Sequence, residues 1–144
     1  MSDGLKGKAL RMLARREHSR AELVRKLAAE GTPQEIRDVL AQLEGSGLLS
    51  DTRFAEAYVA SRAARVGNAR LRHDLRARGI DEETIDAALP GGADSEAGRA
   101  REVWRRKFAA PPADRADWAR QARFLQGRGF APDIIRKVLK ESAE

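Results

Sequence analysis

One pattern occurs three times along this chain and constrains its fold more than any other feature. A helical stretch ends in leucine, a glycine follows four residues later, and a second helical stretch carries isoleucine and leucine four residues apart. The glycines are Gly31, Gly79 and Gly129, which lie 48 and 50 residues apart, and another apolar stretch with helical spacing precedes each copy. A period of this length is typical of a repeat array, in which each unit buries apolar surface against its neighbour.

Apolar residues recur three and four positions apart, and the strict alternation typical of strands occurs nowhere in the sequence. We therefore predict an all-α fold of three tandem three-helix repeats, in which nine helices form an elongated, curved array. The repeats are expected at 1–50, 51–92 and 93–144. A compact globule of nine helices is the alternative. The helices are expected at about 4–16, 19–30, 33–45, 51–66, 69–78, 82–89, 94–108, 115–127 and 132–142.

Polar residues and glycines mark the helix ends. Ser19 with Glu22 and Thr32 with Glu35 have the spacing of capping boxes. A glycine after the last turn is the residue that a left-handed helix end requires, and we expect that conformation at all three repeated glycines. Further N-caps are expected at Asp51, Asn68, Asp81 and Asp114.

Residues that could carry catalysis are scarce. Cysteine is absent, the glycine-rich phosphate loop of nucleotide-binding enzymes is absent, and His18 and His73 are the only histidines. Both histidines are expected to be half-exposed on arginine-rich helices, and neither has a metal-ligand partner at a suitable spacing. The sequence therefore predicts no catalytic, cofactor-binding or metal-binding residues, and a protein that is not an enzyme.

Basic residues are concentrated in the first and second helices of each repeat. Lysine and arginine number 28 against 22 acidic residues, which gives a net charge of +6. The last helices of the first two repeats, by contrast, are acidic. If the repeats stack in register, the basic helices form a positive stripe for a polyanionic or acidic partner; an ordinary solvated helix face is the alternative. The candidate partner-binding residues are Arg15, Arg16, Arg62, Arg70, Arg72, Arg76, Arg105, Arg106 and Lys107.

Three further expectations narrow the possible functions. Residues 19–49 have the order of a helix-turn-helix, but the helix that would enter the major groove, 34–44, is net negative, which disfavours sequence-specific DNA binding. No apolar run approaches the roughly 18 residues of a membrane span, so we expect a soluble, cytoplasmic protein. The aromatic residues expected in the core are Phe54, Tyr58, Trp104, Phe108, Phe124 and Phe130. For Trp118 the sequence does not decide between a core and a surface position.

Five segments, taken in order, resemble the bacterial RecX regulators. They are 15–27 (RREHSRAELVRKL), 47–55 (GLLSDTRFA), 75–80 (LRARGI), 105–108 (RRKF) and 124–130 (FLQGRGF), and the similarity extends over essentially the whole chain. A departure occurs in the third repeat, which has Gln121-Ala122 where the first two repeats have Leu23 and Leu71.

The resemblance implies three tandem three-helix repeats without catalysis of their own. It also implies a regulator that binds the RecA recombinase filament on single-stranded DNA, lies in the groove of that filament, and inhibits strand exchange, ATP hydrolysis and co-protease activity. Such a protein modulates DNA repair, recombination and the SOS response. Separately from the resemblance, we expect the protein to be a monomer. The alternative is a helical protein that binds single- or double-stranded nucleic acid directly and without sequence specificity.

Overall fold

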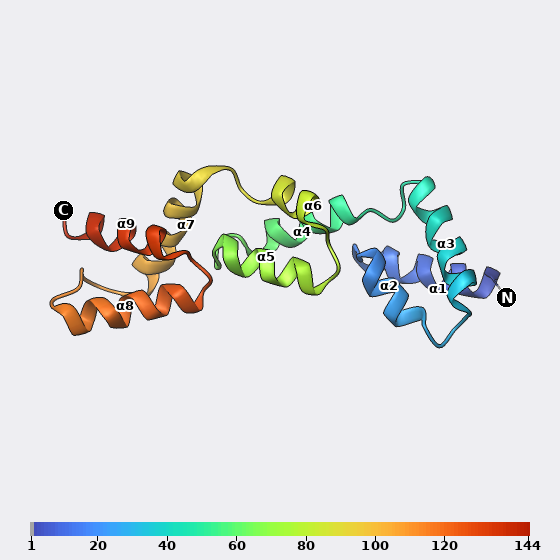
Figure 1. The fold of residues 1–144 in the computed structure, drawn as a ribbon, viewed down its shortest axis with the longest axis horizontal. Coiled ribbons are helices and arrows are strands. Elements are labelled where there is room, and N and C mark those ends of the chain that lie inside the picture. The colour runs from blue at the N-terminus through green and yellow to red at the C-terminus, as the bar shows by residue number, and fades with distance from the viewer. Residues whose placement is uncertain (1) are drawn as a thin grey trace. The chain divides into compact units, whose positions relative to one another are not determined.

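The structure, a computed structural model, describes residues 2–144, apart from the side chains of residues 2, 3 and 92–94 (Figure 1). Over these residues it contains nine helices and no strands, so the predicted all-α fold of three-helix repeats is confirmed. None of the helices described is both long and apolar enough to cross a membrane. The helices are α1 (Ser2–Arg15), α2 (Arg20–Leu27), α3 (Pro33–Gly45), α4 (Asp51–Arg62), α5 (Asn68–Ala77), α6 (Glu82–Ala88), α7 (Gly92–Lys107), α8 (Arg115–Gly127) and α9 (Pro132–Ser142).

The chain forms two compact units, and the division between them passes through α4 and α5. The first unit comprises the residues up to 57 together with 75–88, and the second comprises 58–74 and 89–144. Each unit therefore combines one terminal repeat with part of the middle repeat.

The core of the first unit lies between α1, α2 and α3. Leu23 and Leu27 on α2 and Leu40 on α3 have no exposed surface. Both predicted capping boxes are present: the Ser19 hydroxyl accepts a hydrogen bond from the Glu22 N–H at 3.1 Å, and the pair formed by Thr32 and Glu35 repeats this arrangement. The remaining core residues are Leu5, Ala9, Ile36, Val39, Leu43 and Leu49.

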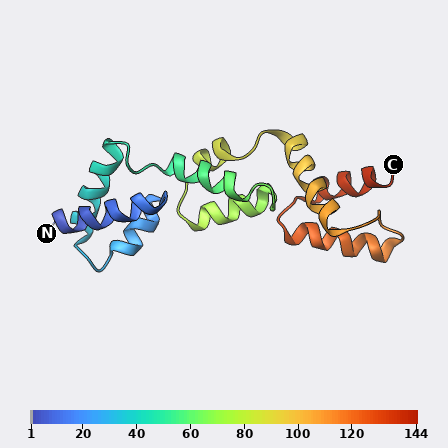
Figure 2. The same cartoon turned by 180° about the vertical axis from the view of Figure 1, so that it is seen from behind.

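The core of the second unit lies between α7, α8 and α9, which are side by side in both views of the fold (Figures 1 and 2). Gln121 takes the place that leucine has in the other repeats and is 1% exposed. Its side-chain oxygen accepts the indole N–H of Trp104 at 2.6 Å, so this buried amide is paired. Phe54, Tyr58, Phe108 and Phe130 are buried as predicted, Trp104 and Phe124 are half-buried, and Trp118 is exposed.

Two predicted N-caps are wrong. The helix α4 is capped by Ser50, whose hydroxyl accepts the Arg53 N–H at 3.1 Å, because Asp51 already belongs to the helix and its carboxylate accepts the backbone N–H of Arg20. Asn68 is likewise the first residue of α5, and its side-chain oxygen accepts a hydrogen bond from Arg99. Both side chains therefore accept hydrogen bonds from residues distant in sequence and do not cap their helices.

One of the three predicted left-handed glycines is also wrong. Gly79 and Gly129 have positive φ, but the third glycine with positive φ is Gly47 rather than Gly31. Gly31 is constrained by space instead, because a Cβ at this position would lie 3.2 Å from Leu5 Cδ2.

The same joint connects successive repeats in both units. The start of a repeat's second helix packs against the glycine turn that follows the second helix of the next repeat. In the first joint the Ser19 hydroxyl donates to the Arg78 carbonyl at 2.8 Å, and in the second joint the Gly67 N–H donates to the Arg128 carbonyl at 2.8 Å. A side chain at Gly79 would collide with Ala21, and one at Gly129 would collide with Arg70.

Candidate polyanion-binding interface

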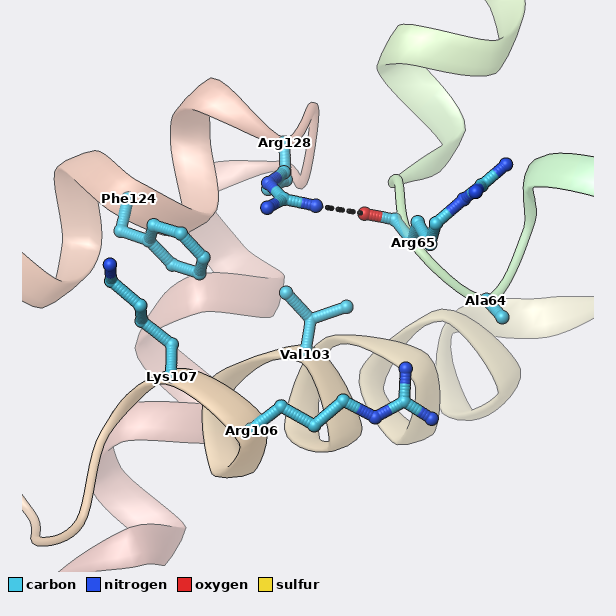
Figure 3. A pocket seen from close by; sticks show the side chains of 7 residues that line it. All are labelled: Ala64, Arg65, Val103, Arg106, Lys107, Phe124 and Arg128. Carbon is cyan, nitrogen blue, oxygen red and sulfur yellow. Dashed lines mark hydrogen bonds between the residues drawn. The ribbon is translucent and has the colours of Figure 1, made fainter.

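Two hollows in the second unit share two arginines. One has a volume of 170 Å³ and a partly apolar lining that includes Val103 and Phe124 (Figure 3). The other has a volume of 300 Å³, and Arg65 and Arg128 line both. We call the cations that line the two hollows the basic cradle; they are Arg62, Arg65, Arg70, Arg106, Lys107 and Arg128.

Helix ends supply half of the cradle cations. Arg62 ends α4, Lys107 ends α7, and Arg128 is the C-cap of α8. A cation is stabilised at a helix C-terminus by the partial negative charge of the unpaired carbonyls. The local sequence therefore places charges where the helices favour them, and the folding of the second unit brings the three ends together.

The turn between α4 and α5 is held in place by Arg99 on α7. The guanidinium of Arg99 donates to the Ala63 carbonyl at 2.7 Å and to the Val66 carbonyl at 3.0 Å. The second joint fixes the same turn from the side of α8, through the bond between Gly67 and Arg128. Burial lowers the pKa of Arg99, and its Nη1 has no hydrogen-bond partner among the side chains and backbone that the structure describes.

Aromatic rings and a carbonyl orient three cations of the cradle without neutralising them. Figure 3 shows Lys107 and Arg128 beside the ring of Phe124, with Lys107 Nζ 5.5 Å and Arg128 Cζ 5.2 Å from the ring centroid. Arg128 also donates to the Arg65 carbonyl at 3.5 Å, and Arg62 lies 4.1 Å above the ring of Tyr58. These contacts restrict the side chains while the positive charge stays available.

Most cations of the cradle have no ion pair within the part of the chain that the structure describes. Among the described residues, only Arg70 of the cradle has a carboxylate within ion-pair distance, that of Asp74 at 3.4 Å. Outside the cradle, ion pairs are common; examples are Arg16–Glu22, Arg20–Glu44, Arg101–Glu141 and Arg105–Glu102. Five uncompensated cations around two adjoining hollows repel one another, so an anionic partner would relieve an unfavourable arrangement.

The structure brings together four of the nine predicted partner-binding residues. Arg62, Arg70, Arg106 and Lys107 belong to the cradle. Of the other predicted residues of the second unit, Arg105 pairs with Glu102, and Arg72 lines neither hollow. In the first unit, Arg16 pairs with Glu22, Arg76 pairs with Glu82, and Arg15 is exposed at the end of α1.

Arg65 and Arg128 were not among the predicted partner-binding residues. Arg65 belongs to the basic run 62–78, and that composition was the available signal. Arg128 stands apart from the basic runs, but it occupies the position before the repeated glycine, as Arg78 does in the middle repeat. Its position at the joint makes it part of the cradle.

The expectation of a half-exposed His18 is wrong. His18 is 3% exposed in the turn between α1 and α2, where Nδ1 lies 3.0 Å from the Arg16 carbonyl oxygen. Burial lowers its pKa, and the cations Arg16 and Lys26 lower it further. His73, by contrast, is exposed. Among the described side chains no group of three or more metal-ligating residues occurs.

The fold and the cradle define an all-helical repeat protein with a cationic surface on its second unit. Three family models match the chain: the first, second and third three-helix domains of RecX, over residues 6–43, 50–89 and 94–139. The chain belongs to the RecX family, and the relatives below give it a regulatory role.

Relatives and solved structures agree with this assignment. The chain is 50% identical over 137 residues to the regulatory protein RecX of Leptothrix cholodnii, which covers 94% of this chain and 87% of that protein. It is 45% identical over 141 residues to the regulatory protein RecX of Chromobacterium violaceum, covering 97% of this chain and 91% of that protein. A crystal structure of RecX from Lactobacillus salivarius has the same fold, with a TM-score of 0.85 at 20% identity over 99% of this chain and 96% of that one.

Proposed function

We propose that this chain binds the filament that RecA recombinase forms on single-stranded DNA and inhibits strand exchange, ATP hydrolysis and co-protease activity. It acts as a cytoplasmic monomer without catalysis of its own, and in this way it modulates DNA repair, recombination and the SOS response. Family membership supports the regulatory role. The observation that carries the proposal is the basic cradle, with five cations that have no carboxylate partner among the described residues.

A nucleoprotein filament offers two kinds of anion to the cradle, protein carboxylates and DNA phosphates. The guanidinium group donates two parallel hydrogen bonds to either of them, which gives arginine an advantage over lysine at such contacts. Five of the six cradle cations are arginines. A protein held on the filament by these contacts excludes a second duplex and stabilises the state of the filament to which it binds.

DNA-dependent ATP hydrolysis by the cognate recombinase tests the proposal. The chain should inhibit at substoichiometric amounts, and the double variant R106E/R128E should need at least about tenfold more protein, the equivalent of about 1.4 kcal/mol. The matched control is R37E/R136E, which changes the net charge equally at two exposed arginines outside the cradle. Equal inhibition by both variants would reject the cradle as the binding surface, and no inhibition by the unchanged chain would reject the function.

Direct binding of nucleic acid is the second candidate. The two hollows share Arg65 and Arg128, and a continuous series of cations is what a phosphodiester backbone requires. If the five uncompensated cations contact phosphates of a single strand, the logarithm of the binding constant should fall with the logarithm of salt concentration at a slope of about −3.5. Bare single-stranded DNA without recombinase distinguishes the candidates, because a pure recombinase ligand would leave it free.

A further inference from the structure

A groove in the first unit has a different chemistry from the cradle. It lies at the first joint, where α2 packs against the end of α5, and has a volume of 470 Å³. We call it the joint groove. Its lining residues are Arg20, Ala21, Val24, Arg25, Asp51, Arg76, Ala77 and Gly79.

The floor of the joint groove is apolar. Val24 is 37% exposed and is one of the few large apolar side chains on the described surface. It follows Leu23, which is completely buried, so the core contact of α2 fixes the direction in which Val24 points. Ala21, Ala77 and Gly79 are small, which leaves room above the valine for an apolar side chain of another molecule.

The rim of the joint groove is basic, and two of its arginines form only exposed ion pairs within the chain. Arg20 pairs with Glu44 at 3.1 Å, and Arg76 pairs with Glu82; all four side chains are at least 37% exposed. Exposed ion pairs contribute only about 0–1 kcal/mol each, so a partner's carboxylates can replace them at little cost. The third cation, Arg25, has no carboxylate within ion-pair distance among the residues described.

Asp51 makes the joint groove a poor site for a polynucleotide. Its carboxylate accepts the backbone N–H of Arg20 at 2.8 Å and therefore stays within the lining. A fixed carboxylate repels a closely spaced series of phosphates, whereas a peptide can place its own carboxylates on the arginines and leave Asp51 unopposed.

At the second joint, an arginine takes the place of the valine that forms the apolar floor. The helices α2 and α5 begin at Arg20 and Asn68, so the residue of α5 equivalent to Val24 is Arg72. The first joint alone thus combines an apolar floor with a basic rim.

We propose that the joint groove binds a short acidic segment of a protein partner. One apolar side chain of that segment packs on Val24, and its flanking carboxylates pair with Arg20, Arg25 and Arg76. An apolar anchor gives such a contact its affinity, and the peripheral charges set the register. Identifying this partner as the recombinase rests on the proposed function; the chemistry of the groove does not.

Fluorescently labelled peptides test the groove without any recombinase. The probe is an acidic peptide with one central leucine, and the control probe is the same peptide with serine in its place. The leucine peptide should bind with a dissociation constant below about 1 mM, and at least about tenfold more tightly than the serine peptide. Equal binding of the two peptides, or no binding of either, would overturn the proposal.

Variants of the full-length chain assign the binding to the groove. V24S and R25E should each weaken binding of the leucine peptide by about fivefold or more, V24I should preserve it, and R106E/R128E in the cradle should leave it within about twofold. Thermal unfolding checks that V24S remains folded. Loss of binding in the cradle variant with retention in V24S would show that the peptide is a general polyanion ligand, which overturns the groove. Recombinase ATPase assays then judge the proposed function separately.

Discussion

The geometry of the first joint predicts how much the free energy of unfolding falls when a single methyl group is added at Gly79. This glycine has a φ of +79°, and an added Cβ would lie well inside van der Waals contact with Ala21 Cβ. Left-handed backbone costs an L-residue about 1–2 kcal/mol, and forcing extra volume into a packed contact costs about 1–3 kcal/mol. Gly79→Ala should therefore lower the free energy of unfolding by about 2–5 kcal/mol.

Gly47 provides a control in the same unit. Its φ is also +79°, but an added Cβ meets no atom within 4 Å. Gly47→Ala should therefore incur the backbone cost alone, about 1–2 kcal/mol. Because alanine restricts the unfolded chain equally at both positions, that contribution cancels in the difference. The difference between the two variants, about 1–3 kcal/mol, measures the close approach at the joint.

Urea unfolding followed by far-ultraviolet circular dichroism measures both variants, since both substitutions lie in the first unit. The double variant G79A/A21G provides a further check, because removing the Ala21 methyl group should recover part of the loss, less up to about 1 kcal/mol for glycine in a helix. If Gly79→Ala and Gly47→Ala were equally destabilising, the two segments would not be in close contact and the joint would be wrong.

Three further predictions concern buried polar groups. Ser19→Ala should cost about 0.5–1.5 kcal/mol more than Thr32→Ala in urea unfolding, because both residues cap a helix but only Ser19 also donates to the next repeat. As pH falls below about 6.5, the free energy of unfolding should decrease, since burial lowers the pKa of His18 and the unfolded chain takes up the proton first; His18→Gln should reduce this dependence. Gln121→Leu should cost about 1–3 kcal/mol by unpairing Trp104, and adding Trp104→Phe should recover part of this loss.

Each of these three predictions has its own contrary result. Equal losses of unfolding free energy in Ser19→Ala and Thr32→Ala would show that the hydrogen bond from Ser19 to the Arg78 carbonyl does not stabilise the joint. His73→Gln is the control for the pH experiment because His73 is exposed, and identical pH dependence in both histidine variants would contradict the burial of His18. Additive effects at Gln121 and Trp104 would show that the two side chains do not interact.

The helices were predictable because their signals are local. The capping boxes of α2 and α3 need only four consecutive residues each, and the structure shows both as predicted. The backbone conformation at Gly31 and Gly47 was not predictable from the repeat alone. Gly31 is constrained by the distant side chain of Leu5, whereas Gly47 has a positive φ in a turn outside the repeated pattern, where the Leu48 N–H returns to the Leu43 carbonyl.

The cradle was only partly predictable because some of its cations are brought together by contacts between residues that are distant in sequence. Arg62 and Arg70 belong to one basic run, and composition alone identified them as candidates. Arg128 is distant in sequence, and its contribution depends on a hydrogen bond across the second joint. Composition gives the sign of the surface charge, but long-range contacts decide which cations act together and which are neutralised by a neighbouring acid.

The two joints explain how one repeated backbone contact supports two different surfaces. In each joint the carbonyl that precedes a glycine accepts a hydrogen bond from the start of an earlier helix, and this contact fixes the backbone. The side chains around it are then free to differ. At the first joint, Val24 and the paired Arg76 form a groove for an apolar anchor with acidic flanks. At the second joint, Arg70 and Arg128 line hollows whose excess charge suits a polyanion. Substitutions at Val24 and at Arg128 should therefore impair different contacts, although the two joints share the same backbone geometry.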